Sequence, residues 1–488
     1  MSGFSTLEIG KKALLAQRFG LEVTSNNIAN VNTPGYSRRA AVLSEDISIR
    51  RNGFFMGNGV IVQKIQSFRS DYYDREIRAI TSRKAAFDVD TQYLKRIETA
   101  LGEPTNDDLD TLMTEFYKSF DQAALNPDNL SFRSYIIDTG VTLAERMNRI
   151  ANSVNELRYE AQNSINDSTK AVNTLLKDLV ELNKLSAYNR HKNDDSSMQF
   201  IDQRELKLQE LSKFFDIKVS QNDDTTVNVF LNGINLVSGV YYSEVNYRVV
   251  TDPLTTESTI ELFRRDIDTG TETNLQPQSG EIFANMRLYN ELLDPVDSSN
   301  NFSIASQFNE FVNTFATKFN EIIINGFGAN DTDPLSPPER PFFVPYNALS
   351  ATPSAGINAF SIQVNPDLIN NPYDLPLSAV AGEPGNTDIA RQLARMSEDK
   401  SFLNNQNPIE YYSSFIARVG SEARQAVNGY SNSKLIDEQL NTQRESLMGV
   451  NLDEEAVNLI KFQKAFEASS RIISVTNELL TTLINLGK

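Results

Sequence analysis

The chain has 488 residues, with 46 Lys and Arg against 64 Asp and Glu and a formal net charge of −18. Such an acidic balance repels phosphate backbones, so nucleic acid is not an expected partner. The absence of cysteine excludes disulfide scaffolds, thiol catalysis and Cys/His zinc sites, and any Ser-His-Asp triad would have to use the single histidine, His191. No apolar run exceeds four residues, which predicts no membrane insertion and no signal-peptide core.

The first predicted element is an amphipathic helix of residues 1–33. Its apolar side chains recur every seven positions, and Leu and Ala favour helix. The Pro34-Gly35 pair gives a strong stop signal. The heptad positions are Leu7, Leu14, Leu21 and Ile28. Residues 36–64 follow as an extended or hairpin-like linker, because Ile and Val alternate there between glycines.

Helices dominate the next part of the chain. Helices are predicted for residues 66–101 and 105–125, and one long helix for residues 129–187, in a stretch that lacks proline from 128 to 252. Helices of average proteins run only about 11–12 residues. A helix of this length needs a partner along its side, which indicates a helical bundle.

The middle of the chain changes character near Asp216. Alternating Val and Ile runs with an Asn232-Gly233 hairpin turn predict strands to about residue 283. A helix at 304–324, a proline-rich connection and a short strand at 360–364 come next, and helices return at 387–398 and 408–447. The predicted fold class is mainly α with a β domain (α+β). The predicted domains are a terminal coiled coil (1–35 plus 452–488), a linker (36–64), a helical bundle (65–215 plus 385–451) and a β-rich outer domain (216–384).

The last predicted helix, 452–486, is apolar on two adjacent faces. One stripe repeats every seven residues: Leu459, Phe466, Ile473 and Leu480. A second stripe lies beside it: Ile460, Ala468, Ile472, Val475 and Leu479. A single partner helix covers one stripe, so two stripes favour packing against one helix of the same chain and against neighbouring subunits. A helix buried within one globule has the same pattern, and this alternative stays open.

No motif in the sequence indicates catalysis. His191 lies in a polar stretch typical of a solvated turn. The acidic clusters at 107–108, 194–195, 223–224 and 453–455 lack the spacing of an EF-hand, and two of them open predicted helices, where acids complement the helix dipole. Phosphate-binding loops and serine elbows are absent from the sequence. Nothing in the sequence points to a hydrolase that uses a pair of carboxylates, although this alternative stays open here. We expect no cofactor, no metal and no enzyme activity, the last because of the resemblance described next.

Two segments resemble signatures of a known family. Residues 25–38, Ser-Asn-Asn-Ile-Ala-Asn-Val-Asn-Thr-Pro-Gly-Tyr-Ser-Arg, resemble the N-terminal signature of bacterial flagellar axial proteins, which are the rod, hook and hook-associated proteins. Residues 449–469 resemble their C-terminal signature. The ending Asn-Thr-Pro-Gly-Tyr-Ser-Arg and the long helical arms are most similar to hook-associated members. The resemblance is specific over about the first and last 40 residues and weak over roughly 220–380.

The resemblance implies a structural subunit of the extracellular flagellum, at the junction between hook and filament. Its implied partners are further copies of itself in a helical ring, hook protein and the next hook-associated junction protein. It also implies unfolded export through the flagellar type III apparatus, with a chaperone on the C-terminal helix. The alternatives are a rod or hook subunit with mostly β arms, an enzyme or adhesin displayed through 217–380, and a coiled-coil scaffold inside the cell.

We hypothesise that the terminal helices are poorly ordered in the monomer and pair on assembly to line an inner tube, because burial must offset about 1–2 kcal/mol of backbone entropy per ordered residue. Four Asn residues would tie the turn at Pro34-Gly35-Tyr36 through side-chain hydrogen bonds, although a solvated helix end fits them equally well. The adjustable element at the junction would be residues 34–60. The predicted assembly residues are Leu7, Leu14, Leu21, Asn26, Asn27, Ile28, Asn30, Asn32, Pro34, Gly35, Tyr36, Leu452, Leu459, Phe466, Ile473 and Leu480.

Overall fold

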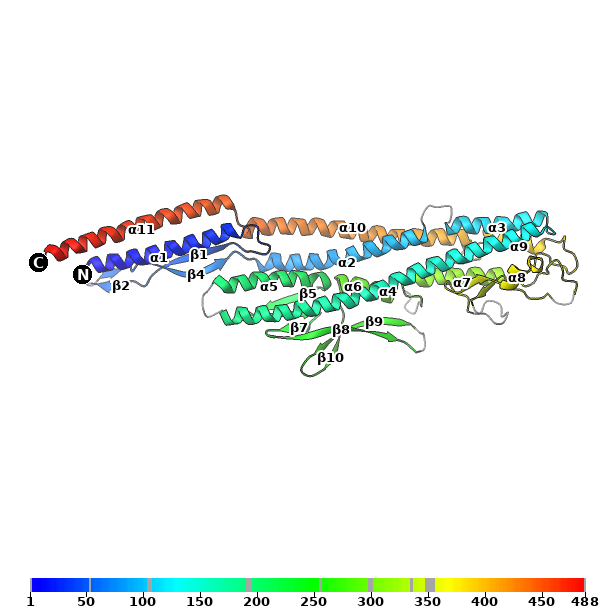
Figure 1. The fold of residues 1–488 in the computed structure, drawn as a ribbon, viewed down its shortest axis with the longest axis horizontal. Coiled ribbons are helices and arrows are strands. Elements are labelled where there is room, and N and C mark those ends of the chain that lie inside the picture. Colours follow the sequence, from blue (N-terminus) through cyan, green and yellow to red (C-terminus); the bar gives the residue numbers. More distant parts are fainter. Residues whose placement is uncertain are drawn as a thin grey trace.

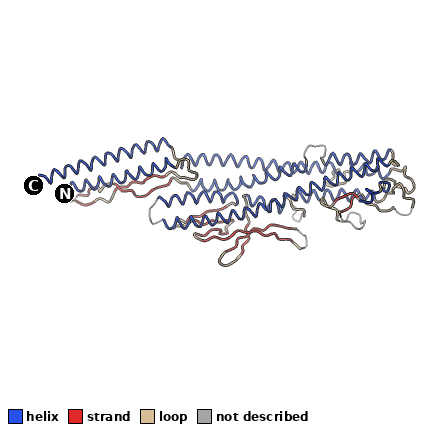
Figure 2. Tube along the Cα trace, in the orientation of Figure 1, coloured by secondary structure: helices blue, strands red, loops and turns tan. Residues whose placement is uncertain are grey.

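The molecule is long and narrow, and both chain ends lie at the same tip (Figure 1). The computed structural model describes residues 2–51, 54–102, 108–189, 195–253, 257–296, 302–333, 337–346 and 356–486. Helices run along most of its length, whereas strands are found beside the terminal helices, in one sheet on the side of the bundle and in the distal loops (Figure 2). The predicted α+β class is confirmed.

The tip that holds both termini is a slender unit that we call the terminal stalk. Its helix α1 contacts both α11 and a two-stranded antiparallel ribbon, β1 with β4, paired from Arg39↔Ser67 to Glu45↔Val60. A small hairpin, β2 with β3, continues the ribbon toward the tip. The elements of the stalk are α1 (Ser2–Ala29), β1 (Arg39–Glu45), β2 (Ile49–Arg51), β3 (Phe54–Met56), β4 (Val60–Ser67) and α11 (Leu452–Leu486).

The bundle behind the stalk is made of long helices. Its longest helix, α4, has 60 residues and confirms the helix predicted for 129–187. It packs on α3 and α5, while α10 runs along α2. The bundle helices are α2 (Asp71–Leu101), α3 (Leu109–Leu125), α4 (Leu130–Asn189), α5 (Asp195–Phe214) and α10 (Pro408–Met448).

The distal end of the bundle holds a core of aromatic rings. Phe116 of α3 packs at a tilt against Phe319 of α7, with 5.2 Å between ring centroids, and against Phe342, with 5.5 Å. Helix α7 (Ile304–Ile323) buries Phe308, Phe311, Phe315 and Phe319 on one face, so it requires an apolar partner and finds one in the bundle. The distal elements are α7, α8 (Pro366–Asn370), α9 (Asp388–Arg395) and the strands β11 (Phe343–Pro345) and β12 (Ile362–Val364).

This packing corrects the predicted outer domain of residues 216–384. The main sheet ends at Leu275, and the segment from α7 to α9 belongs to the core of the bundle. The sequence suggested one β-rich unit because prolines and short apolar runs follow the strands, but the aromatic face of α7 decides where this segment packs. The outer β part is therefore shorter than predicted.

The main sheet is a six-stranded antiparallel meander in the order β10-β9-β8-β7-β6-β5, on the side of the bundle (Figure 1). Asn232 and Gly233 both have positive φ at the β6–β7 turn, as the Asn-Gly pair predicts. The side chain of Asn173 on α4 attaches the sheet, since it bonds both the amide and the carbonyl of Val245 at 2.8 Å. The strands are β5 (Ile217–Gln221), β6 (Val227–Leu231), β7 (Ile234–Ser238), β8 (Tyr241–Thr251), β9 (Ser258–Asp266) and β10 (Glu272–Leu275), followed by α6 (Glu281–Arg287).

The start of α6 depends on Gly280. This residue has φ of 102°, and a Cβ atom there would overlap the carbonyl oxygen of Phe214 at the end of α5. We expect Gly280→Ala to lower the free energy of unfolding by about 2 kcal/mol, because alanine is strained at this φ and its Cβ atom would overlap the Phe214 carbonyl. Chemical denaturation would measure the loss. The control is Gly270→Ala, which has φ of 68° in open space. Equal losses at both glycines would show that the contact with Phe214 is unimportant.

Candidate assembly interface

The two terminal helices pair in antiparallel fashion along the stalk. Gly10 of α1 lies against Ile473 of α11, and Gly20 lies against Phe462. The pairing ends at Asn27, whose side chain bonds Glu455 at 3.0 Å. Buried and partly buried side chains of α11 include a series with alternating spacings of four and three, which is the heptad pattern of a coiled coil. The series is Glu455, Leu459, Phe462, Phe466, Ser469, Ile473, Thr476 and Leu480.

The predicted apolar residues of α11 divide between two environments. The stripe of Leu459, Phe466, Ile473 and Leu480 falls in the heptad series above. The second stripe is largely exposed, including Ile472, Val475 and Leu479. Leu452 is also exposed, at the first turn of the helix. The intramolecular pair therefore covers one stripe and leaves the other uncovered.

On α1, the predicted heptad residues Leu7, Leu14, Leu21 and Ile28 are all partly buried. The most buried side chains of α1 are smaller or polar: Ala16, Val23, Thr24 and Asn27. Helix α1 is covered by the β1–β4 ribbon as well as by α11, so both contacts contribute to this burial. Gly10 and Gly20 lie directly against α11, because small residues let the two helices come together.

Asn27 holds the turn that leaves the stalk. Its Nδ2 donates to the carbonyl of Arg39 at 2.8 Å and to Glu455, and its Oδ1 accepts from the amide of Arg39 at 3.1 Å and from the Tyr36 hydroxyl at 2.8 Å. All the hydrogen-bonding positions of this buried amide are used. Asn27 thereby joins α1, β1 and α11 at one point.

The other predicted asparagines have lesser roles. Asn30 Nδ2 donates to the carbonyl and the side-chain oxygen of Asn26, and Asn30 Oδ1 accepts from the Thr33 hydroxyl at 3.1 Å. These bonds end α1 and begin the turn. Asn32 and Pro34 are exposed, whereas Gly35 lies close to Leu206 of α5. Gly35 has φ of 76°, so glycine suits this position.

A buried charged group fixes the same turn onto the bundle. Asp202 of α5 accepts from the Ser37 hydroxyl at 3.1 Å, from Arg39 at 2.8 Å and from Arg69 at 3.1 Å. Arg69 also bonds Asp74 at 2.7 Å, and Glu205 pairs with Arg78. We call this set the Asp202 cluster: Ser37, Arg39, Arg69, Asp74, Arg78, Asp202 and Glu205.

Burial governs the electrostatics of the Asp202 cluster. It raises the pKa of Asp202 above its usual value, more than Arg39 and Arg69 lower it. It likewise raises the pKa of Glu205, despite Arg78 and Arg69. For Arg69, burial alone would lower the pKa, but the neighbouring carboxylates, Asp74 foremost, raise it. The ion pairs of the cluster therefore fix the position of the turn on α5, but burying their charges costs free energy.

Arg38 faces the opposite side and contacts α11. Its Nε bonds Glu455 at 2.9 Å, its guanidinium pairs with Glu454 at 3.0 Å, and its amide donates to the carbonyl of Met448 at 3.1 Å. Adjacent arginines thus tie the turn to α11 on one side and to α5 on the other. The arginine pair was visible in the sequence, but its carboxylate partners lie more than 160 residues away.

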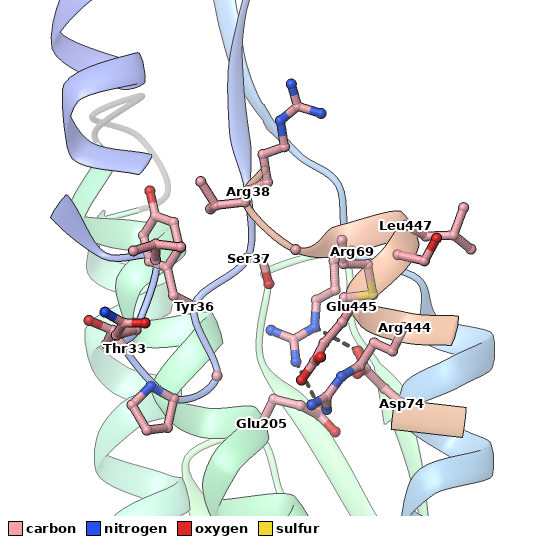
Figure 3. A pocket seen from close by; sticks show the side chains of 18 of the residues that line it. Thr33, Tyr36, Ser37, Arg38, Arg69, Asp74, Glu205, Arg444, Glu445 and Leu447 are labelled. Atoms are coloured by element: carbon pink, nitrogen blue, oxygen red, sulfur yellow. Dashed lines mark hydrogen bonds and ion pairs between the residues drawn. The ribbon is translucent and has the colours of Figure 1, made fainter. Parts of the chain in front are cut away.

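A polar cavity of about 850 Å³ lies where the stalk meets the bundle. Figure 3 shows Arg69 in it, hydrogen-bonded to Asp74 and ion-paired with Glu205, with Arg444 and Glu445 of α10 alongside. Across the described ranges, no group of three or more His, Asp or Glu side chains is arranged to hold a metal ion. The predicted solvated turn at His191 lies outside the described residues. The charged groups around this cavity can set the orientation of the stalk on the bundle.

The sequence predicts no membrane insertion. Within the described part of the chain, none of the helices combines the length and apolar character needed to span a lipid bilayer.

Comparison with known families gives three matches along the chain. The flagellar hook-associated protein FlgK helical domain matches residues 94–336. The flagellar basal body rod FlgEFG protein C-terminal region matches residues 445–486, and the flagella basal body rod protein family matches residues 7–36. The two terminal matches coincide with the helices of the stalk.

Similar proteins extend over nearly the whole chain. Flagellar hook-associated protein 1 of Bacillus subtilis is 26% identical, over 99% of this chain and 98% of the relative. The protein of the same name from Escherichia coli is 22% identical, over 99% and 100%. The solved flagellar hook junction protein FlgK from Burkholderia pseudomallei superposes with a TM-score of 0.60 at 12% identity, over 76% of this chain and all of that one. This last likeness supports the fold.

Proposed function

The chain belongs to the family of flagellar hook-associated protein 1, and on this basis we propose that it connects the hook to the filament as a non-enzymatic subunit of the junction. Membership places it in the extracellular flagellum as a structural subunit. The observation that carries the proposal is the terminal stalk, in which α11 pairs with α1 and leaves a second apolar stripe exposed. A chain that self-assembles needs such an uncovered surface.

In the proposed assembly, copies of the chain form a helical ring whose terminal stalks line the inner tube. The bundle forms the next layer, and the six-stranded sheet projects outward. Hook protein lies on one side of the ring and the next hook-associated junction protein on the other. Residues 34–60 are the segment that adjusts to the change from curved hook to straighter filament, and Ser37 and Arg39 anchor its first part to Asp202.

Export is a further part of the proposal. The chain passes unfolded through the flagellar type III apparatus, and a chaperone covers the C-terminal helix until then. The exposed stripe of α11, which includes Ile472 and Leu479, supports this role because it is apolar and accessible in the monomer. The absence of cysteine agrees with passage between compartments.

The nearest alternative is a rod or hook subunit. That assignment required mostly β structure in the arm, where α4 is one continuous helix of 60 residues. The family match at 94–336 covers this helix as well. Both observations favour the junction subunit.

Deleting residues 452–488 tests the proposal. We expect motility to be lost and the purified chain to stay monomeric, because α1 loses its partner and the exposed stripe is removed. Circular dichroism of the truncated chain should show the helix content expected if residues 66–447 are still folded. Motility assays, with the chain measured in the medium, separate failed assembly from failed export.

A point variant serves as the matched control for export. Val475→Glu keeps the whole helix but places a charge on the exposed stripe, so we expect secretion with reduced incorporation into flagella. Lys464→Ala, on an exposed polar position of the same helix, should behave as the unchanged chain. A truncated chain that still joins hook to filament would contradict the role of the terminal helices and assign the junction to the bundle.

A further inference from the structure

We propose that the ribbon of one copy packs on the exposed stripe of α11 of the next copy. This contact deepens the proposed function and rests on it. Two surfaces of the stalk are involved. The ribbon tip is formed by Ile47, Phe55, Met56 and Ile61, and the outer stripe of α11 by Ile472, Val475 and Leu479.

Both surfaces are apolar and strongly exposed. Ile47 is 84% exposed and Phe55 75%, and Val475 and Leu479 are 54% and 60% exposed. On α1, between them, Leu15 is the one large apolar side chain that is exposed among the described residues. Several exposed aromatic and aliphatic side chains so close together indicate an interaction surface, especially in a chain with a net charge of −18.

The two surfaces lie at the same level along α1 but on different faces of it. On the ribbon side, Gly59 packs on Ile9, and Asp46 pairs with Lys12. On the other side, Ile473 packs on Gly10. Figure 1 shows α11 and the ribbon on either side of α1 near the tip. Each copy therefore presents two separate apolar surfaces at one height.

The symmetry of a ring requires two different surfaces. Copies that follow one another around a ring or helix meet through heterologous contacts, in which one patch binds a different patch on its neighbour. A contact between two identical patches closes at a dimer and cannot propagate. The ribbon tip and the outer stripe form such a pair of different patches on the same stalk.

Charge favours this pairing over self-pairing of the ribbon tips. Residues 47–64 contain three basic residues, Arg50, Arg51 and Lys64, and no acidic residue. The outer stripe of α11 is flanked by one charge of each sign, Arg471 and Glu478. Arg50 lies opposite Phe55 in the β2–β3 hairpin, and Glu478 precedes Leu479. Two ribbon tips would repel each other, whereas a ribbon tip against α11 can bring Arg50 against Glu478.

Disulfide cross-linking tests the contact, because the chain has no cysteine of its own. Phe55→Cys and Val475→Cys chains are produced together in cells that lack their own copy of this chain, and isolated flagella are mildly oxidised. We expect roughly tenfold more cross-linked dimer from the mixture than from either variant alone, since disulfides form only when two Cβ atoms come within about 4.5 Å. A mixture of Tyr241→Cys, exposed on the outer sheet, with Val475→Cys is the matched control and should give no dimer.

The possible results separate this contact from the proposed function. Dimer from Val475→Cys alone, in an amount equal to the mixture, would overturn the contact in favour of self-pairing of α11. Motile cells whose flagella contain the variants but yield no cross-link would also overturn it, and the junction role would stand. Absence of the cysteine-free chain from isolated flagella would instead overturn the proposed function.

A charge reversal gives a second measurement at exposed positions, where folding is unaffected. We expect Arg50→Glu to reduce incorporation into flagella several-fold, because it places an acid against Glu478 of the next copy. Adding Glu478→Arg to the same chain should restore incorporation, since every contact in the ring then regains opposite charges. Failure of the double variant to recover would count against the contact.

Discussion

Replacing Asp202 by alanine is expected to lower the free energy of unfolding by about 3–5 kcal/mol, because removing one partner of a buried ion pair leaves the opposite charges poorly compensated. Asp202 is the carboxylate that Ser37, Arg39 and Arg69 share, and the Arg39 side chain is only 4% exposed. Urea denaturation would measure the loss. The amide hydrogen-exchange rates of residues 33–39 should also rise in this variant, because the turn is then no longer fixed on α5.

The control for Asp202→Ala lies on the same helix. Glu210 forms an exposed pair with Lys207, so Glu210→Ala should cost no more than about 0.5 kcal/mol. The pKa of Asp202 is raised because the cost of burying its carboxylate outweighs the attraction of Arg39 and Arg69. The main contribution of Asp202 is therefore to position the turn. Unchanged hydrogen exchange of the turn in Asp202→Ala would contradict this positioning role.

The helices were predictable because their signals are local. The heptads of the terminal helices, the stop at Pro34 and the proline-free stretch before α4 each need only a window of the sequence. The sheet meander followed from the same kind of signal at Asn232-Gly233. The position of α7 could not be predicted in this way. Its apolar face packs against residues of α3 and α4, which lie far away in the chain.

The candidate site was predictable in part. The family signature led to Asn27 and the turn at Pro34-Gly35-Tyr36, but the partners that make Asn27 central are Glu455, 428 residues away, and the backbone of Arg39. The Asp202 cluster escaped prediction for the same reason. Single acids on a helix such as α5 resemble ordinary surface residues until the fold brings arginines against them.

The glycines of α1 show what apolar periodicity alone leaves out. Gly10 and Gly20 carry no side chain for a hydrophobic count, yet they set how closely α11 approaches. The leucine heptad on the same helix is partly buried. The apolar pattern therefore predicts the helix but not the two positions of closest approach.

Gly20→Leu is therefore expected to separate the terminal helices and abolish motility. A Cβ atom at Gly20 would lie 2.6–2.9 Å from ring atoms of Phe462, and a leucine needs still more room. We expect a loss of about 3 kcal/mol from overpacking, at the upper end of its usual range. Leucine favours helix over glycine by nearly 1 kcal/mol, so the loss cannot come from α1 unwinding. Thermal denaturation and motility assays would measure both effects.

Phe462 provides the matching test of this explanation. Combining Gly20→Leu with Phe462→Ala removes the ring that the leucine would strike, so the double variant should recover part of the stability and motility. Phe462→Ala alone should weaken the pair, because it leaves a space above Gly20. The two changes are thus expected to compensate each other, as residues in contact do and distant independent sites do not. Simple addition of the two losses would mean that α1 and α11 are not paired in this register in the assembled flagellum.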